Sequence, residues 1–327
     1  MDSLVTNFPN GVSSFGQVLY GSGIVTQGNV WFVAPGTGSD VNDGKTARTP
    51  FATLAKALDS ATANQNDIVY LLAQSNTAAD TTDYQSTALD WNKDGVHLIG
   101  INNGVQIGQR SRISNLSTAT AIVDGLFIVS ADNCLIANIE VFQGQGGTNP
   151  TGASIAVKVS GQRNRFYNCQ ISGIGHSELD DATSRSLSVT GAENYFEKCY
   201  IGLDTVIRAT ATAEVTVGDI ARTIFDGCFF NTYTSLSTFK MVTYSAPDRF
   251  ILFKNCVINA VLNITSAVAP TGALAAATSV NGTILVVNSP VIGFADVATA
   301  DDTKILVYGT GNGTLVGLGL AGTVDVA

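Results

Sequence analysis

Two groups of acidic side chains in this sequence are candidates for catalysis. The first is the stretch GHSELDDATSR, with His176, Glu178, Asp180, Asp181 and Arg185. The second comprises Glu197 and Asp226, which stand apart in the chain. Enzymes that hydrolyse glycosidic bonds place two carboxyl groups ~5–5.5 Å or ~6.5–9.5 Å apart. These residues would therefore support cleavage of a glycan.

A repeated pattern brings Glu197 and Asp226 close together in the expected fold. The motif Phe-x-x-Cys recurs with Phe at positions 166, 196, 225 and 253, which are spacings of 30, 29 and 28 residues. Such a period is typical of stacked structural repeats. The residue after each Phe faces outward, so Glu197 and Asp226 are expected about one coil spacing, ~4.8 Å, apart. The alternative is a solvated row of charges in which Lys254 is the partner.

Each repeat has the pattern of two strands joined by a one-residue corner. Cys169 and Ile171 share one face and alternate with Gln170, which is the period of a strand. Phe166 and Cys169 are three residues apart, so the chain must turn near Asn168, a residue type that tolerates sharp bends. The sequence therefore predicts an all-β, right-handed parallel β-helix with coils of about 28–30 residues. A β-sandwich with coincidental spacing is the alternative.

The rest of the chain is expected to be organised around this stack. We predict an extended arm at 1–28, an entry strand, loop and capping helix at 29–66, the β-helix at 67–262, and a β segment at 263–327. The helix would begin at the N-cap Thr49 with Pro50 in first position. Its apolar stripe would be Phe51, Leu54, Ala55 and Leu58. The final segment, rich in Ala, Gly, Thr and Val, would form extra coils or a small oligomerisation domain.

Composition and charge argue against several classes of protein. The chain has 327 residues, of which 45% are hydrophobic and only 13% charged, and its net charge is −9. An acidic surface repels phosphate backbones, so no nucleic-acid partner is expected. The sequence has no stretch of ~18 apolar residues, so no membrane helix is expected, and no signal peptide is evident at the N-terminus.

No metal and no cofactor are expected either. The sequence has five cysteines, four of them at one position of the repeat, which indicates packed thiols. The histidines, His97 and His176, form no Cys/His cluster with zinc spacing. The SDVNDG loop lacks the acidic residue that a calcium loop carries at its twelfth position.

One segment resembles a known family. The stretch WFVAPGTGSDVNDGKTARTPFATLAKAL, together with the coils after it, resembles the entry to right-handed β-helix proteins of tailed bacteriophages. The opening NFPNGVSSFG is also similar to a phage virion protein. The family includes tailspikes that cut or bind host polysaccharide, and tailspike-like trimers that decorate and stabilise capsids. The resemblance implies a β-helix, a homotrimer and a place on the virion after synthesis in the host cytoplasm.

From these features we expect a trimeric capsid decoration (cement) protein, not an enzyme, bound to the phage major capsid protein on the capsid surface. The arm would attach through Phe8, Pro9, Phe15, Leu19 and Tyr20. Two outward rows become apolar toward the C-terminal coils and predict the trimer interface at Tyr195, Tyr200, Ile224, Phe229, Leu252 and Val257. The alternative is a tailspike or tail fibre that binds or cleaves host polysaccharide. Its candidate residues are Glu178, Asp180, Asp181, Glu197 and Asp226.

Overall fold

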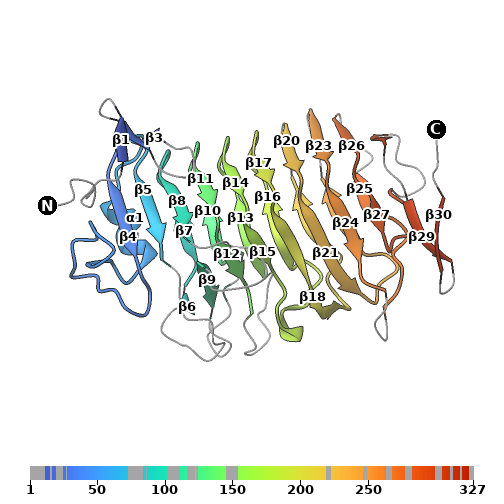
Figure 1. Ribbon diagram of the computed structural model, residues 1–327. Helices are drawn as coiled ribbons and strands as arrows, with labels where there is room; N and C mark the ends of the chain where they lie inside the picture. The colour runs from blue at the N-terminus through green and yellow to red at the C-terminus, as the bar shows by residue number, and fades with distance from the viewer. Residues whose placement is uncertain are drawn as a thin grey trace, which may run out of the picture.

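Three parallel sheets wind around one apolar core in the computed structural model of this chain (Figure 1). The structure describes residues 28–72, 87–101, 111–115, 122, 124–144, 154–218, 222–245, 249–262, 267–276, 282–298 and 304–309. It also gives the backbone of six further strands: β1 (Val12–Ser14), β2 (Gln17–Leu19), β3 (Val25–Thr26), β6 (Tyr84–Gln85), β29 (Asn312–Val316) and β30 (Gly319–Thr323).

The sheets are numbered here in the order in which a coil visits them. Sheet 1 contains β4 (Val30–Val33), β5 (Ile68–Leu71), β8 (His97–Gly100), β11 (Leu135–Ala137), β14 (Arg165–Tyr167), β17 (Tyr195–Glu197), β20 (Thr223–Asp226), β23 (Phe250–Lys254), β26 (Thr283–Val287) and β28 (Ile305–Tyr308). Sheet 2 contains β6, β9 (Arg112–Asn115), β12 (Glu140–Phe142), β15 (Gln170–Ser172), β18 (Tyr200–Arg208), β21 (Phe229–Thr234), β24 (Val257–Ala260), β27 (Val291–Ile292), β29 and β30. Sheet 3 contains β7 (Leu89–Trp91), β10 (Phe127–Val129), β13 (Ile155–Val159), β16 (Arg185–Val189), β19 (Ala213–Val217), β22 (Lys240–Tyr244) and β25 (Leu274–Ala276).

Each coil runs from sheet 1 through a corner to sheet 2, and then through a loop to sheet 3. The predicted one-residue corners are confirmed, because their backbones have positive φ: 56° at Asn138, 51° at Asn168, 52° at Lys198, 63° at Gly227 and 53° at Asn255. Residues with little steric penalty in this region, Asn and Gly, hold four of these five places. Each corner turns the chain from a strand of sheet 1 into a strand of sheet 2. Repetition of this turn in successive coils winds the chain into a parallel β-helix.

The repeated Phe and Cys form ladders inside the helix, as predicted. Phe166, Phe196, Phe225 and Phe253 stack with ring centroids 4.7, 4.9 and 5.1 Å apart. The Cys199 thiol donates a hydrogen bond to the Phe166 carbonyl oxygen one coil before it, and Cys228 does the same to Phe196. Burial raises the pKa of both thiols well above their usual value. The Phe-x-x-Cys motif is therefore a packing motif.

The capping helix exists but begins later than predicted. Helix α1 spans Leu54–Ser60, and Thr53, not Thr49, is its N-cap. The Asp40 carboxylate accepts hydrogen bonds from the Ala52 and Thr53 N–H groups and so holds the chain extended before the helix. The buried face of the helix consists of Leu54, Ala57 and Leu58, whereas Ala55 is exposed. Phe51 precedes the helix but is buried in the same apolar core, where it forms a bridge with Val33.

The sheets extend past residue 262, because β25 to β28 pair in parallel with strands of the preceding coil. Strand β30 then pairs antiparallel with β29. Within the described part of the chain, no helix is both long and apolar enough to cross a membrane.

Candidate functional site

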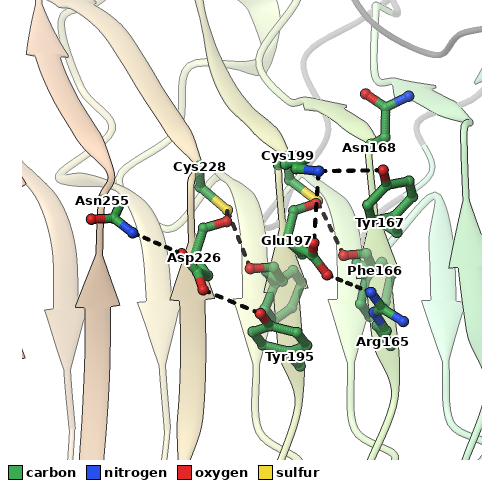
Figure 2. A network of polar contacts seen from close by, with 12 residues as sticks. Arg165, Phe166, Tyr167, Asn168, Tyr195, Glu197, Cys199, Asp226, Cys228 and Asn255 are labelled. Atoms are coloured by element: carbon green, nitrogen blue, oxygen red, sulfur yellow. Dashed lines mark hydrogen bonds and ion pairs between the residues drawn. The ribbon is translucent and has the colours of Figure 1, made fainter.

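Side chains on the outer face of sheet 1 form the candidate site. The Phe ladder points inward, so the residues on either side of each Phe point outward. One outer row pairs Arg165, Tyr195, Ile224 and Leu252, and the other pairs Tyr167, Glu197, Asp226 and Lys254. We call Arg165, Glu197, Lys198, Asp226 and Lys254 the charged ladder. Figure 2 shows its central part, with two tyrosines between the charged groups.

Glu197 is the first carboxylate of the charged ladder. Its Oε2 accepts a hydrogen bond from Arg165 Nη2 at 2.5 Å, and Lys198 Nζ lies 3.9 Å from Oε1 (Figure 2). Strand β17 places Glu197, and the corner after it places Lys198. The Glu197 side chain is 19% exposed, whereas those of both cations are more than half exposed. The carboxylate therefore lies at the surface within reach of a ligand.

Asp226 is the second carboxylate and lies one coil further along. Its Oδ2 lies 3.3 Å from both Tyr195 Oη and Lys254 Nζ, and Asn255 Nδ2 donates to Oδ1 at 3.5 Å (Figure 2). The register of β17 and β20 pairs Glu197 directly with Asp226. A strand spacing of ~4.8 Å sets the separation of such neighbours. This strand spacing is close to the ~5–5.5 Å that separates the two catalytic carboxyl groups of retaining glycosidases.

Two tyrosines complete the site. Tyr167 lies between two cations, with Arg165 Cζ 5.5 Å and Lys198 Nζ 5.3 Å from its ring centre. The Tyr195 ring lies 5.9 Å from Arg165 Cζ. Desolvation, together with the charges of Asp226 and Glu197, raises the pKa of Tyr195. Its hydroxyl therefore keeps its proton near neutral pH, and the site combines a proton donor with two carboxylates.

The aspartates of the acidic loop between β15 and β16 are hydrogen-bonded within the protein. Both Asp180 oxygens are occupied, because they accept hydrogen bonds from the N–H groups of Ala209, Thr210 and Ala211 at 2.7–2.9 Å. Asp181 accepts from the Thr183 N–H and hydroxyl, which lowers its pKa. The Glu178 N–H donates to His176 Nδ1 within the 3-10 helix η1 (Ser177–Leu179). These residues do not converge with Glu197 and Asp226.

The other predicted residues lie as follows. The predicted attachment residues Phe8, Pro9, Phe15, Leu19 and Tyr20 are outside the residues whose side chains the structure describes. Of the predicted interface residues, Tyr200 is 9% exposed, because its ring stacks on Phe229 and its hydroxyl accepts from Asn231. Tyr195, Ile224, Leu252, Phe229 and Val257 are half-buried. The trimer interface stays a prediction.

Loop carboxylates considered for metal binding are also used within the fold. Asp43 accepts from the Thr49 hydroxyl and the Lys45 N–H, and Asp40 holds the start of α1. Among the described residues, no group of three or more His, Cys, Asp or Glu side chains could hold a metal ion.

The sequence did not identify Arg165 and Lys198 as partners of Glu197, or Tyr167 as the ring that these two cations contact. Their signal was their position, because Arg165 and Tyr167 flank Phe166 and Lys198 follows Glu197 directly. It also did not identify the buried pair of Arg208 at the end of β18 and Glu214 in β19. No repeat position marks this pair, since Arg208 stands at the end of the unusually long strand β18.

Comparison with known proteins identifies the architecture. Neither a protein-family model nor a curated protein sequence matches the chain. A rhamnogalacturonan lyase superposes with a TM-score of 0.54 at 16% identity, over 81% of this chain and 68% of that chain. A pectin methylesterase from Erwinia chrysanthemi gives 0.56 at 15% identity, over 88% and 91%. A pectate lyase gives 0.51 at 12% identity, over 88% and 80%.

At these identities the similarity establishes the parallel β-helix fold alone. It nevertheless corrects the expected function. We expected a capsid decoration protein without enzymatic activity, whereas these solved structures are named as lyases and a methylesterase. The comparisons give no support to a phage virion family in particular.

Proposed function

We propose that this protein is a polysaccharide-active enzyme that holds an extended glycan along the outer face of sheet 1. One observation carries the proposal: adjacent coils place Glu197 and Asp226 side by side, with the protonated Tyr195 hydroxyl 3.3 Å from Asp226. Two carboxylates and a proton donor are the groups that glycan cleavage requires. The names of the solved structures with this fold agree with such a substrate class.

The arrangement assigns roles to the side chains. Glu197 and Asp226 are the carboxylates that act as base or nucleophile, and the Tyr195 hydroxyl donates a proton to the leaving oxygen. Arg165 and Lys254 hold the carboxylates through ion pairs. The straight line of coils suits a long, unbranched stretch of sugars, because each coil adds one similar step along the axis.

The test is turnover of a panel of neutral and acidic polysaccharides. New reducing ends, unsaturated ends and released methanol would report hydrolysis, elimination and ester cleavage respectively. Glu197→Gln or Asp226→Asn should lower the rate by about 10²-fold or more, since positioned acid–base groups contribute about that much.

A matched control is Asp124→Asn, which removes an exposed carboxylate paired with Lys158 near sheet 3. It should leave turnover unchanged. Turnover that survives in both Glu197→Gln and Asp226→Asn would contradict the proposed site. Turnover of no polysaccharide by the wild-type protein would contradict the proposed function.

A further inference from the structure

The net charge of the charged ladder has the opposite sign to the net charge of the whole chain. Its three cations and two carboxylates give a net charge of +1, whereas the whole chain carries −9. On the turns that precede these strands, Arg163 and Arg222 share the Glu193 carboxylate. A local positive strip on an acidic protein attracts anions and directs them to that strip. The ladder therefore favours an anionic ligand.

The charges follow a definite order along the axis of the helix. Arg165 lies on β14, and Lys198 Nζ reaches back over the ring of Tyr167 on the same strand. Glu197 and Asp226 lie on the next two strands, and Lys254 lies on the strand after those. The ladder is therefore positive at both ends and negative in the middle. Its end strands are three strand steps apart, which is about 14 Å. The end cations reach inward from those strands, because Arg165 Nη2 lies 2.5 Å from Glu197 and Lys254 Nζ lies 3.3 Å from Asp226, so the charged atoms are closer together than the strands.

This order selects among anionic polymers. A polymer with a negative group at every sugar would place charges against Glu197 and Asp226, and like charges at such distances repel. Nucleic acids, with one charge per ~1.7 Å of duplex, would meet the same repulsion. A glycan with spaced charges avoids it, because an uncharged sugar can lie over the carboxylates and Tyr195 while charged sugars reach the two ends.

We infer that the charged ladder binds an acidic polysaccharide in which negatively charged sugars are separated by uncharged ones. This inference rests on the proposed function and specifies its substrate class. The positive ends bind the charged sugars, and the middle carboxylates act on a bond next to an uncharged sugar. Selectivity comes from attraction at the ends and repulsion in the middle.

The experiment compares binding of the full-length protein to three soluble polymers by titration calorimetry. Hyaluronan carries a carboxylate on every second sugar, polygalacturonate carries one on every sugar, and dextran carries none. Hyaluronan should bind about tenfold more tightly than either of the others, a difference that corresponds to about 1.4 kcal/mol. Its affinity should fall as salt is raised, because salt screens exposed charges.

Two kinds of variant give opposite results if the inference is correct. Arg165→Gln or Lys254→Gln should weaken hyaluronan binding several-fold. Glu197→Gln should strengthen polygalacturonate binding, because it removes repulsion in the middle; a merely structural role for Glu197 would not produce this gain. Lys158→Gln, which removes a cation on sheet 3, is the matched control and should change neither affinity.

Other outcomes distinguish failure of this inference from failure of the proposed function. Equal binding of dextran and hyaluronan, or tightest binding of polygalacturonate, would overturn the inference and leave the proposed function standing. Single-stranded DNA is titrated in parallel, and tighter binding of DNA than of all three polysaccharides would overturn the assignment of a glycan. Absence of binding to all three polysaccharides, together with absence of turnover in the panel above, would overturn the proposed function itself.

Discussion

Hydrogen bonds decide which acidic residues are available for chemistry. Asp180 has both carboxylate oxygens on backbone N–H groups, and Asp181 is bonded to Thr183. Glu197 and Asp226 instead pair with the half-exposed side chains of Arg165 and Lys254. A loop position nominated Asp180 and Asp181 from the sequence, and the repeat position after Phe nominated Glu197 and Asp226. Only the structure separates the two that hold a turn together from the two that face outward.

His97 supplies a prediction about pH. Its Nδ1 accepts a hydrogen bond from the Leu135 N–H, and burial lowers its pKa below the ordinary value of 6.5, although Asp67 opposes part of the shift. The unfolded chain therefore takes up a proton more readily than the folded chain. The stabilisation is complete above pH 6.5 and should be lost as the pH falls from there through the lower folded pKa.

The variant His97→Asn tests this by chemical denaturation at several pH values. The Asn oxygen keeps an acceptor for the Leu135 N–H and does not titrate. Below pH 6.5 the wild-type free energy of unfolding should decline more steeply than that of the variant. Parallel curves would show that His97 does not contribute to the acid sensitivity.

At the level of elements, the repeat could be predicted from the sequence because each coil uses the same contacts. Phe stacks on Phe and the corner needs positive φ, so both leave a pattern in the residue types. The start of α1 could not be predicted as well, because Asp40, distant in sequence, bonds to Ala52 and Thr53 and delays the helix. The two carboxylates of the site were predicted for the same reason as the coils. Of their cationic partners, Lys254 was also anticipated from its position in the repeat, whereas Arg165 and Lys198 were recognised only from the contacts of their side chains.

The buried pair of Arg208 and Glu214, with its hydrogen-bond partners, joins four strands, β16, β18, β19 and β21, and gives a second prediction. Arg208 Nη2 lies 3.0 Å from Glu214 Oε1, and neither side chain is exposed to solvent. Glu214 also accepts from Ser186 and Thr232. Glu214→Leu would leave a buried guanidinium without its counter-charge, and should lower the free energy of unfolding by about 3–5 kcal/mol.

The double variant Arg208→Met with Glu214→Leu is the matched comparison. It removes both charges and should recover part of the lost stability, since a buried ion pair costs desolvation energy as well as supplying attraction. Urea denaturation would measure both. A double variant as unstable as Glu214→Leu alone would show that the hydrogen bonds of Arg208 to Gly173 and Ile174 matter more than the pair.

On the scale of the whole molecule, the β-helix offers three outer faces of different chemistry. Sheet 1 carries the charged ladder. The middle of sheet 2 is largely buried on its outer side, as Glu140, Gln170 and Tyr200 show. Sheet 3 presents the half-buried hydroxyls of Ser188, Thr216 and Thr243. Sheet 1 places two carboxylates directly opposite each other on adjacent strands, beside cations that are at least half exposed, so the account places the glycan there.

The most direct test is the position of a bound oligosaccharide. A crystal structure of the Glu197→Gln variant, with an oligosaccharide from the polymer that the wild-type protein turns over, would show it. The account predicts sugars along the outer face of β14, β17, β20 and β23, with one ring beside Tyr195 and Asp226. Sugars along the outer face of sheet 3 or sheet 2, with the charged ladder left in solvent, would contradict it.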